Sequence, residues 1–171
     1  MLRQIDKWYR RLLWLMMATA AVYIGLIMVA IVYSTMFRYF GWSYSPYTFT
    51  FIEYGFIYSL MLGSPWLVRH RGHVYIEILT AAVSDRVRNV LSRFVAFLCA
   101  FVCFVLAWYM GALAYEDFVT SKYDELRAQL DIQRWIVTSA LPLGFGLMAV
   151  EFTRFIFARV TMHTGEAGVH E

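Results

Sequence analysis

The stretch LLWLMMATAAVYIGLIMVAIVYSTMF, residues 12–37, carries no charged side chain. A helix needs about 20 predominantly apolar residues to cross a membrane, and this stretch is longer than that. Three further stretches follow: residues 48–68, interrupted only by Glu53, the charge-free residues 94–115, and residues 135–158. The sequence therefore predicts an all-α integral membrane protein with four transmembrane helices.

The composition supports this class. Hydrophobic residues make up 61% of the chain and charged residues 16%, and the mean hydropathy is +0.56. Soluble domains are closer to half apolar and a quarter charged. The net charge of +3 comes from basic residues at the ends of apolar stretches, which does not indicate nucleic-acid binding. The whole chain, residues 1–171, is predicted to form one membrane domain.

The positions of Lys and Arg predict the orientation in the membrane. Residues 1–11 contain four of them and residues 69–93 contain five, whereas residues 37–47 and 116–134 together contain four. Because basic residues concentrate in cytoplasmic loops, both termini are expected in the cytoplasm. Residues 116–134 are then a periplasmic loop.

Two segments are predicted to lie along the membrane surface. Residues 1–11 form an amphipathic N-terminal arm, in which apolar residues recur at helical spacing between basic ones. Residues 74–90 form a cytoplasmic interfacial helix with an apolar stripe on one face and polar residues on the other. A short soluble cytoplasmic turn is the alternative for this second segment.

Residues 94–115 show two stripes at helical spacing. Alanines, Cys103 and Gly111 form a small-residue stripe, which favours close approach of another helix. Aromatic residues from Phe94 to Trp108 form a second stripe, expected to face lipid or another protein. Pro142 and the glycines after it predict a kink in the fourth span.

Ionisable residues inside a membrane need partners. Glu53 lies within the second span, and Arg38 at the end of the first is its predicted partner, as a structural clamp; a proton or ion relay through Glu53 is the other hypothesis. Glu151 and Arg154 lie three positions apart on the fourth span, so they can pair, and Arg93 is a possible third member.

The four histidines lie outside the predicted spans, and no catalytic triad, phosphate loop or metal-ligand cluster appears in the sequence. The sequence predicts no enzyme activity, no metal and no cofactor. In the outer loop, Tyr123, Leu126 and Leu130 follow Ser121 with helical spacing, although a solvated loop fits equally well. Among the acids of this loop, Asp124 and Glu125 are the candidates for docking another protein.

An ordered set of short motifs resembles one family. Its members, in chain order, are Arg38-Tyr39, Ser45, Glu53-Tyr54, Gly63, the segment RHRGHVYIEIL at residues 69–79, and LPLGF at residues 141–145. Together they resemble the DctQ-like small membrane subunit of tripartite ATP-independent periplasmic (TRAP) transporters. The sharpest element is Gly72-His73-Val74 followed by Glu77. Ser64-Pro65 departs from the small residues expected after Gly63 and could kink the second span.

The resemblance implies an accessory scaffold subunit of a sodium-driven system that imports an organic acid. Its implied partners are a large multi-span membrane subunit, a periplasmic substrate-binding protein and membrane lipids, in a bacterial inner membrane. Arg69, Arg71, His73 and Glu77 are structural candidates within the family segment, and no substrate site is expected in this subunit. The alternative hypothesis is a stand-alone four-helix proton-coupled transporter that uses Glu53.

Overall fold

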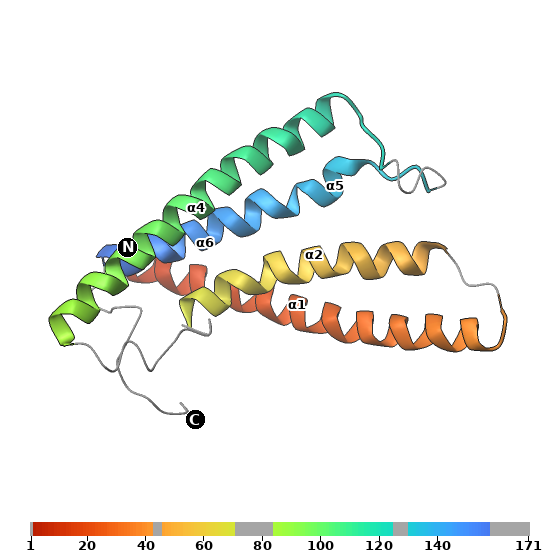
Figure 1. The fold of residues 1–171 in the computed structure, drawn as a ribbon, viewed down its shortest axis with the longest axis horizontal. Coiled ribbons are helices and arrows are strands. Elements are labelled where there is room, and N and C mark those ends of the chain that lie inside the picture. Colours follow the sequence, from red (N-terminus) through yellow and green to blue (C-terminus); the bar gives the residue numbers. More distant parts are fainter. Residues whose placement is uncertain (1, 43–45, 71–83, 125–129, 158–171) are drawn as a thin grey trace.

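The computed structural model describes residues 2–42, 46–70, 84–124 and 130–157. Its elements are helices: α1 (Leu2–Tyr39), α2 (Pro46–Arg69), α4 (Asp85–Val119), α5 (Arg134–Thr138) and α6 (Ala140–Phe157). They form two hairpins, α1 with α2 and α4 with α5 and α6 (Figure 1). The predicted all-helical class is confirmed.

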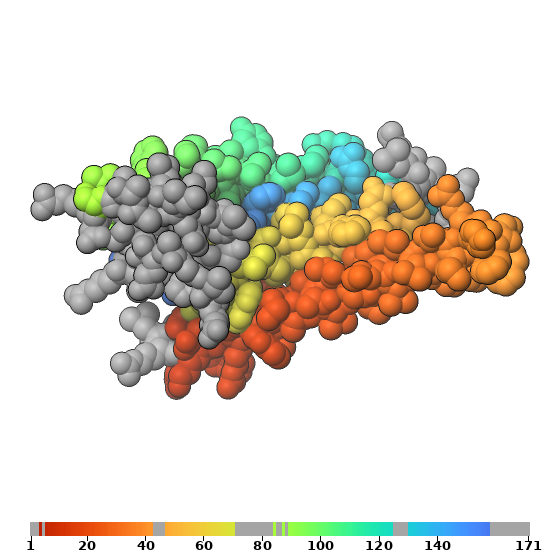
Figure 2. Space-filling view, turned by 60° about the horizontal axis from the view of Figure 1, so that its bottom comes forward, coloured from red at the N-terminus to blue at the C-terminus, as the bar shows by residue number. Residues whose placement is uncertain are grey.

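The main helices lie side by side in one layer. Helix α4 packs against α6, α6 against α2, and α2 against α1, so that α4 and α1 are the two edges. Figure 2 shows these helices as neighbouring ridges, from α1 in red and orange to α4 in green. Because each hairpin contributes one inner helix, the α2–α6 contact joins the two hairpins.

Small residues allow α4 and α6 to pack closely. Ala96, Ala100 and Cys103 of α4 are buried in one apolar cluster with Phe152 and Phe155 of α6. Without a hydrophobic driving force in lipid, close backbone approach and dense packing hold helices together. The small-residue stripe predicted from the sequence therefore faces α6.

The two hairpins lie close together at Gly144 of α6. A Cβ atom placed there would lie 2.6 Å from Sδ and 3.0 Å from Cα of Met61 on α2. Within the first hairpin, a Cβ at Gly55 of α2 would lie 2.9 Å from Cδ1 of Ile27 on α1. Both glycines are therefore positions where one helix lies almost against the next.

Apolar side chains cover much of the outside of the layer. On α4, the aromatic residues of the second predicted stripe are exposed, for example Phe104 at 63% and Trp108 at 71%. Within the part of the chain that the structure describes, three segments are long and apolar enough to cross a membrane: Asp6–Tyr39, Asn89–Val119 and Arg134–Phe157. The structure therefore belongs to a membrane protein.

Helix α2, with 24 residues that include Glu53 and several tyrosines, serines and threonines, is not one of these three segments. A fourth span thus remains a prediction. The helix continues through Pro65 without a break. The hydroxyl of Ser64 donates a hydrogen bond of 2.6 Å to the carbonyl of Leu60.

Several predicted boundaries differ from the structure. Residues 2–11 continue directly into the first span as one helix, and residues 85–90 belong to α4, which starts well before residue 94. Residues 74–83 of the predicted interfacial helix lie outside the described residues. The predicted span 135–158 is divided at Ser139, because Pro142 has no N–H to donate to the carbonyl of Thr138.

The predicted helical pattern after Ser121 is wrong at its start. Ser121 has a φ of 48°, and Tyr123 forms an antiparallel bridge with Gln133. The N–H of Arg134 donates to the carbonyl of Lys122 at 2.9 Å. Backbone pairing satisfies polar groups at the two ends of this connection, and residues 125–129 between them lie outside the described residues.

Candidate functional site

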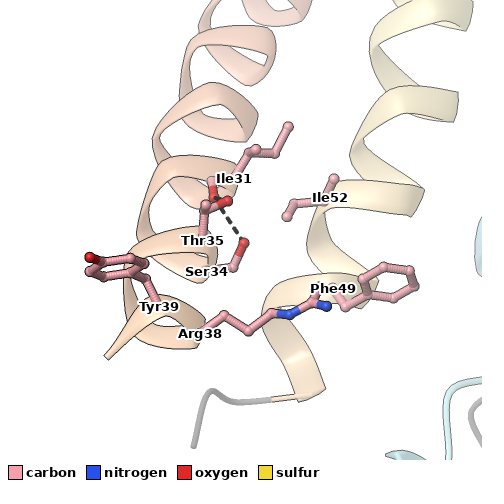
Figure 3. Close-up of a pocket in the computed structure, with 7 residues that line it drawn as sticks. All are labelled: Ile31, Ser34, Thr35, Arg38, Tyr39, Phe49 and Ile52. Carbon is pink, nitrogen blue, oxygen red and sulfur yellow. Dashed lines mark hydrogen bonds between the residues drawn. The ribbon is translucent and has the colours of Figure 1, made fainter. Parts of the chain in front are cut away.

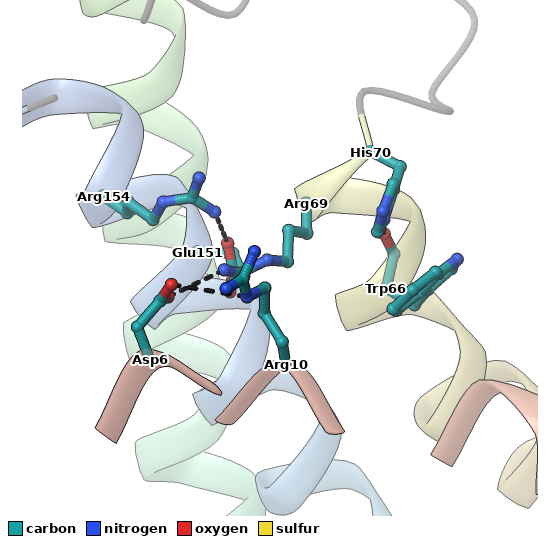
Figure 4. Close-up of polar contacts among 7 residues, drawn as sticks. All are labelled: Asp6, Arg10, Trp66, Arg69, His70, Glu151 and Arg154. Atoms are coloured by element: carbon teal, nitrogen blue, oxygen red, sulfur yellow. Dashed lines mark hydrogen bonds and ion pairs between the residues drawn. The ribbon is translucent and has the colours of Figure 1, made fainter. Parts of the chain in front are cut away.

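A buried carboxylate lies where α1, α2 and α6 meet. Glu151 of α6 is 0% exposed, and its two oxygens accept hydrogen bonds from Arg69 at 2.8 Å and Arg154 at 3.0 Å (Figure 4). A charge taken out of water is stable only when opposite charges and hydrogen bonds compensate it. The two guanidinium groups supply both to Glu151.

Arg69 connects this carboxylate to the first helix. Its Nη1 donates to Glu151, while its Nη2 donates to Asp6 Oδ1 at 2.9 Å. The planar guanidinium suits such a bridge because its donors point in fixed directions. Asp6 also pairs with Arg10 at 3.4 Å, one helical turn along α1. We call Asp6, Arg10, Arg69, Glu151 and Arg154 the Glu151 cluster.

An aromatic ring lies against Arg69 of the cluster. The Arg69 guanidinium carbon lies 5.6 Å from the centre of the Tyr9 ring, within the range of a cation–π contact. The Arg69 side chain is only 7% exposed. Arg69 is also the last residue of α2, where the helix dipole favours a positive charge. Beside it, the His70 ring stacks on Trp66 with 3.9 Å between ring centres.

A second buried carboxylate lies near the C-terminal end of α4. Asp117 is 0% exposed and accepts hydrogen bonds from Arg134 Nε at 2.9 Å and Nη2 at 2.6 Å. The hydroxyl of Thr138 donates to the same carboxylate at 3.3 Å. This bidentate pair, the Asp117 pair below, joins the end of α4 to α5.

Two tyrosines of α2 contact the same region. Tyr54 donates a hydrogen bond to the carboxylate of Asp124, and Tyr58 donates to the backbone carbonyl of Ile136. The connection between α4 and α5 is thus attached to the inner helix of the other hairpin.

The structure brings together some of the predicted site residues. Glu151 and Arg154 pair as their spacing predicts, whereas Arg69, not Arg93, is the further cationic member. Arg38 lines a pocket between α1 and α2 (Figure 3) and forms no ion pair among the described residues. The predicted clamp to Glu53 is therefore not formed among the described residues, where the Arg38 side chain instead extends toward Phe49 of α2 (Figure 3).

Other predicted residues stay untested. Arg71, His73, Glu77 and Glu125 lie outside the described residues. Asp124 is half-buried and bonded to Tyr54, so its carboxylate is already engaged within the chain.

Sequence reasoning missed Asp6, Asp117 and Arg134, and it named Arg69 as a structural candidate without predicting its partners. Asp6 is the only acid among the basic residues of the first turns, and Asp117 stands just after the charge-free third stretch. An acid in such a position indicates a carboxylate that pairs with a basic residue of another segment. The partners could not be chosen from the sequence, because Asp6 and Arg69 are separated by 63 positions and Arg69 and Glu151 by 82.

The ion pairs of Glu151 and Asp117 act as cross-links between helices. Among the described residues, no group of three or more His, Cys, Asp or Glu side chains could hold a metal ion. Each buried carboxylate is occupied by arginine donors from another helix, which holds those helices in one relative position.

The comparisons with known proteins give one match. The family model of the tripartite ATP-independent periplasmic transporters, DctQ component, matches residues 27–162 of the 171. No curated protein and no solved structure matches the chain. DctQ is a transporter component that works with a second membrane subunit, DctM, and a binding protein, DctP. Since the match covers most of the chain, this protein belongs to the DctQ family of small TRAP transporter subunits.

Proposed function

We propose that the chain is the accessory scaffold subunit of a sodium-driven TRAP transporter that imports an organic acid. The large multi-span subunit would carry the substrate and sodium sites, and a periplasmic binding protein would deliver the substrate. In this proposal the chain lies in the bacterial inner membrane with four transmembrane helices and both termini in the cytoplasm. Membership of the DctQ family supports it.

The observation that carries the scaffold role is the burial of Glu151 between two arginines. A carboxylate that moves ions or protons must reach water or its cargo, whereas Glu151 is 0% exposed and hydrogen-bonded on both oxygens. The Glu151 cluster joins α1, α2 and α6. Three helices joined in this way are suited to hold a neighbouring subunit in place while another part of the transporter moves.

Uptake in liposomes tests the proposal. The chain, the large membrane subunit and the binding protein are reconstituted together, and each is then omitted in turn. We expect sodium-dependent uptake of the organic acid only with all three components. Undiminished uptake without this chain would contradict the scaffold role, as would failure of the chain to copurify with the large subunit.

The same liposomes test the stand-alone alternative through Glu53. Glu53 is exposed on α2. We expect the chain alone to move no substrate, both as the native chain and as Glu53→Gln. Proton-coupled transport by the chain alone that disappears in Glu53→Gln would replace the scaffold proposal with the transporter hypothesis.

We further propose that Asp124 and Glu125 help dock the binding protein. Changing both to Lys should weaken uptake without changing assembly with the large subunit. The exchange also removes the Tyr54–Asp124 hydrogen bond, so Tyr54→Phe is the matched control, which keeps both acids. Equal uptake in the Lys variant and the native chain would refute docking, and an equal loss in Tyr54→Phe would assign the effect to the hydrogen bond.

A further inference from the structure

A pocket opens between α1 and α2 at the ends that their connection joins. It has a volume of about 540 Å³ and is lined by Arg38 with Ile31, Ser34, Thr35 and other residues (Figure 3). The remaining lining residues are Tyr39, Phe49 and Ile52. Pockets of about 300–1,000 Å³ are of the size that holds a small-molecule group in proteins.

The pocket exists because the two helices diverge. At Gly55 they are so close that a Cβ atom would lie 2.9 Å from the side chain of Ile27. Beyond this crossing, Ile31 and Ile52 lie across the gap from each other and Arg38 lies at its end, as Figure 3 shows. The gap therefore has an apolar inner part and a cationic end.

The position of the pocket along α1 indicates its depth in the bilayer. Ile31 and Tyr39 are eight residues apart on α1, which is about 12 Å along the helix axis. The headgroup region on each side of a bilayer is about 5–8 Å thick, outside a hydrocarbon core of about 30 Å. Since Arg38 stands in the last turn of this spanning helix, the pocket extends from the headgroup level into the hydrocarbon.

The polar groups favour one kind of occupant. Among the described residues Arg38 has no ion-pair partner, so its guanidinium can donate hydrogen bonds to a phosphate. The hydroxyls of Ser34 and Thr35 donate to the carbonyl of Ile31 at 2.9 and 2.8 Å. Their oxygens are left as acceptors, which fits a headgroup that carries hydroxyls of its own.

We propose that this pocket binds one anionic phospholipid, with its phosphate on Arg38 and the start of an acyl chain between Ile31 and Ile52. One cation compensates one phosphodiester charge. The apolar walls would leave a soluble phosphate ester without contacts along most of the pocket. This site is independent of the scaffold proposal, because it depends only on the spanning position of α1.

Native mass spectrometry of the full-length chain in detergent micelles tests the site. Phosphatidylglycerol, phosphatidylcholine with the same acyl chains, and glycerophosphoglycerol without acyl chains are titrated separately. We expect saturable binding of one phosphatidylglycerol, with clearly weaker binding of the other two. Equal binding of phosphatidylcholine would overturn the anionic site, and equal binding of the soluble ester would overturn the role of the apolar walls.

Two variants and one control separate the pocket from general attraction to basic residues. Arg38→Gln should weaken phosphatidylglycerol binding about fivefold or more, the factor associated with one basic residue near anionic lipid. Thr35→Trp keeps the charge but fills the pocket, and should weaken binding at least as much. Arg93→Gln removes an exposed arginine of α4 and should leave this binding unchanged.

Arg38 and Thr35 are both exposed, so neither substitution disturbs buried packing, and circular dichroism verifies the helix content. Unchanged binding in Arg38→Gln or in Thr35→Trp would overturn the proposal. So would an equal loss in Arg38→Gln and Arg93→Gln.

Discussion

The Glu151 cluster and the Asp117 pair differ in what they connect, although each centres on a carboxylate that is 0% exposed. Glu151 takes its hydrogen bonds from Arg154 of its own helix and from Arg69, 82 positions away in the other hairpin. Asp117 takes two hydrogen bonds from Arg134, 17 positions away, and one from Thr138, 21 positions away in the same hairpin. The first therefore fixes the two hairpins relative to each other, and the second fixes one turn of one hairpin.

Removing the charge of Glu151 should have the largest effect. In Glu151→Gln the buried Arg69 keeps only the half-exposed Asp6 as a partner, and breaking a buried ion pair costs about 3–5 kcal/mol. We expect that loss in the free energy of unfolding, measured by titrating micelles of the purified chain with a denaturing detergent. A loss below about 1 kcal/mol would contradict the stabilising role that the account gives to the Glu151 cluster.

The matched control for Glu151 is Glu116→Gln. Glu116 pairs with Lys122 at 2.6 Å, but the two side chains are 59% and 41% exposed. An exposed ion pair contributes about 0–1 kcal/mol. Glu116→Gln should therefore leave the unfolding free energy nearly unchanged.

Asp117→Asn should have a smaller and more local effect. Hydrogen bonds to charged groups contribute about 1.5–3 kcal/mol, and Arg134 is 42% exposed and can regain water. Hydrogen exchange should increase at the end of α4 and in α5 while the α2–α6 contact stays protected. Exchange that spreads to α2 would show that the Asp117 pair also connects the hairpins.

The contact between hairpins can also be tested without changing charge. Gly144→Ala places a methyl group against Met61, including its Cα atom at 3.0 Å. Such overpacking costs about 1–3 kcal/mol. Gly146→Ala is the control, because nothing lies within 4 Å of a Cβ at that position. The account predicts a lower unfolding free energy for Gly144→Ala only; equal values for the two variants would place the α2–α6 contact elsewhere.

Local sequence patterns predicted what depends on neighbours along the helix. The charge-free residues 12–37 predicted the first span, and the small-residue stripe predicted the face of α4 that packs on α6. The spacing of three predicted the Glu151–Arg154 pair. Each of these follows from helical geometry alone.

The long-range pairs could not be predicted in this way. The sequence identifies Arg69 only as a structural candidate of the family segment, and the packing of α2 between α1 and α6 turns it toward Asp6 and Glu151. The Arg38–Glu53 clamp was predicted from proximity to the same end of a hairpin. It is not formed among the described residues, where Arg38 extends toward Phe49 of α2, a direction that no local pattern encodes.

A double-mutant cycle of Arg69→Gln and Glu151→Gln tests most directly whether the Glu151 cluster connects the two hairpins. Groups that act together show coupling energies of about 0.5–3 kcal/mol, whereas independent sites add within about 0.5 kcal/mol. The account predicts a coupling of at least about 1.5 kcal/mol in the unfolding free energy between Arg69 and Glu151. Additive losses would contradict it, and the bridge between α2 and α6 would then not stabilise the fold.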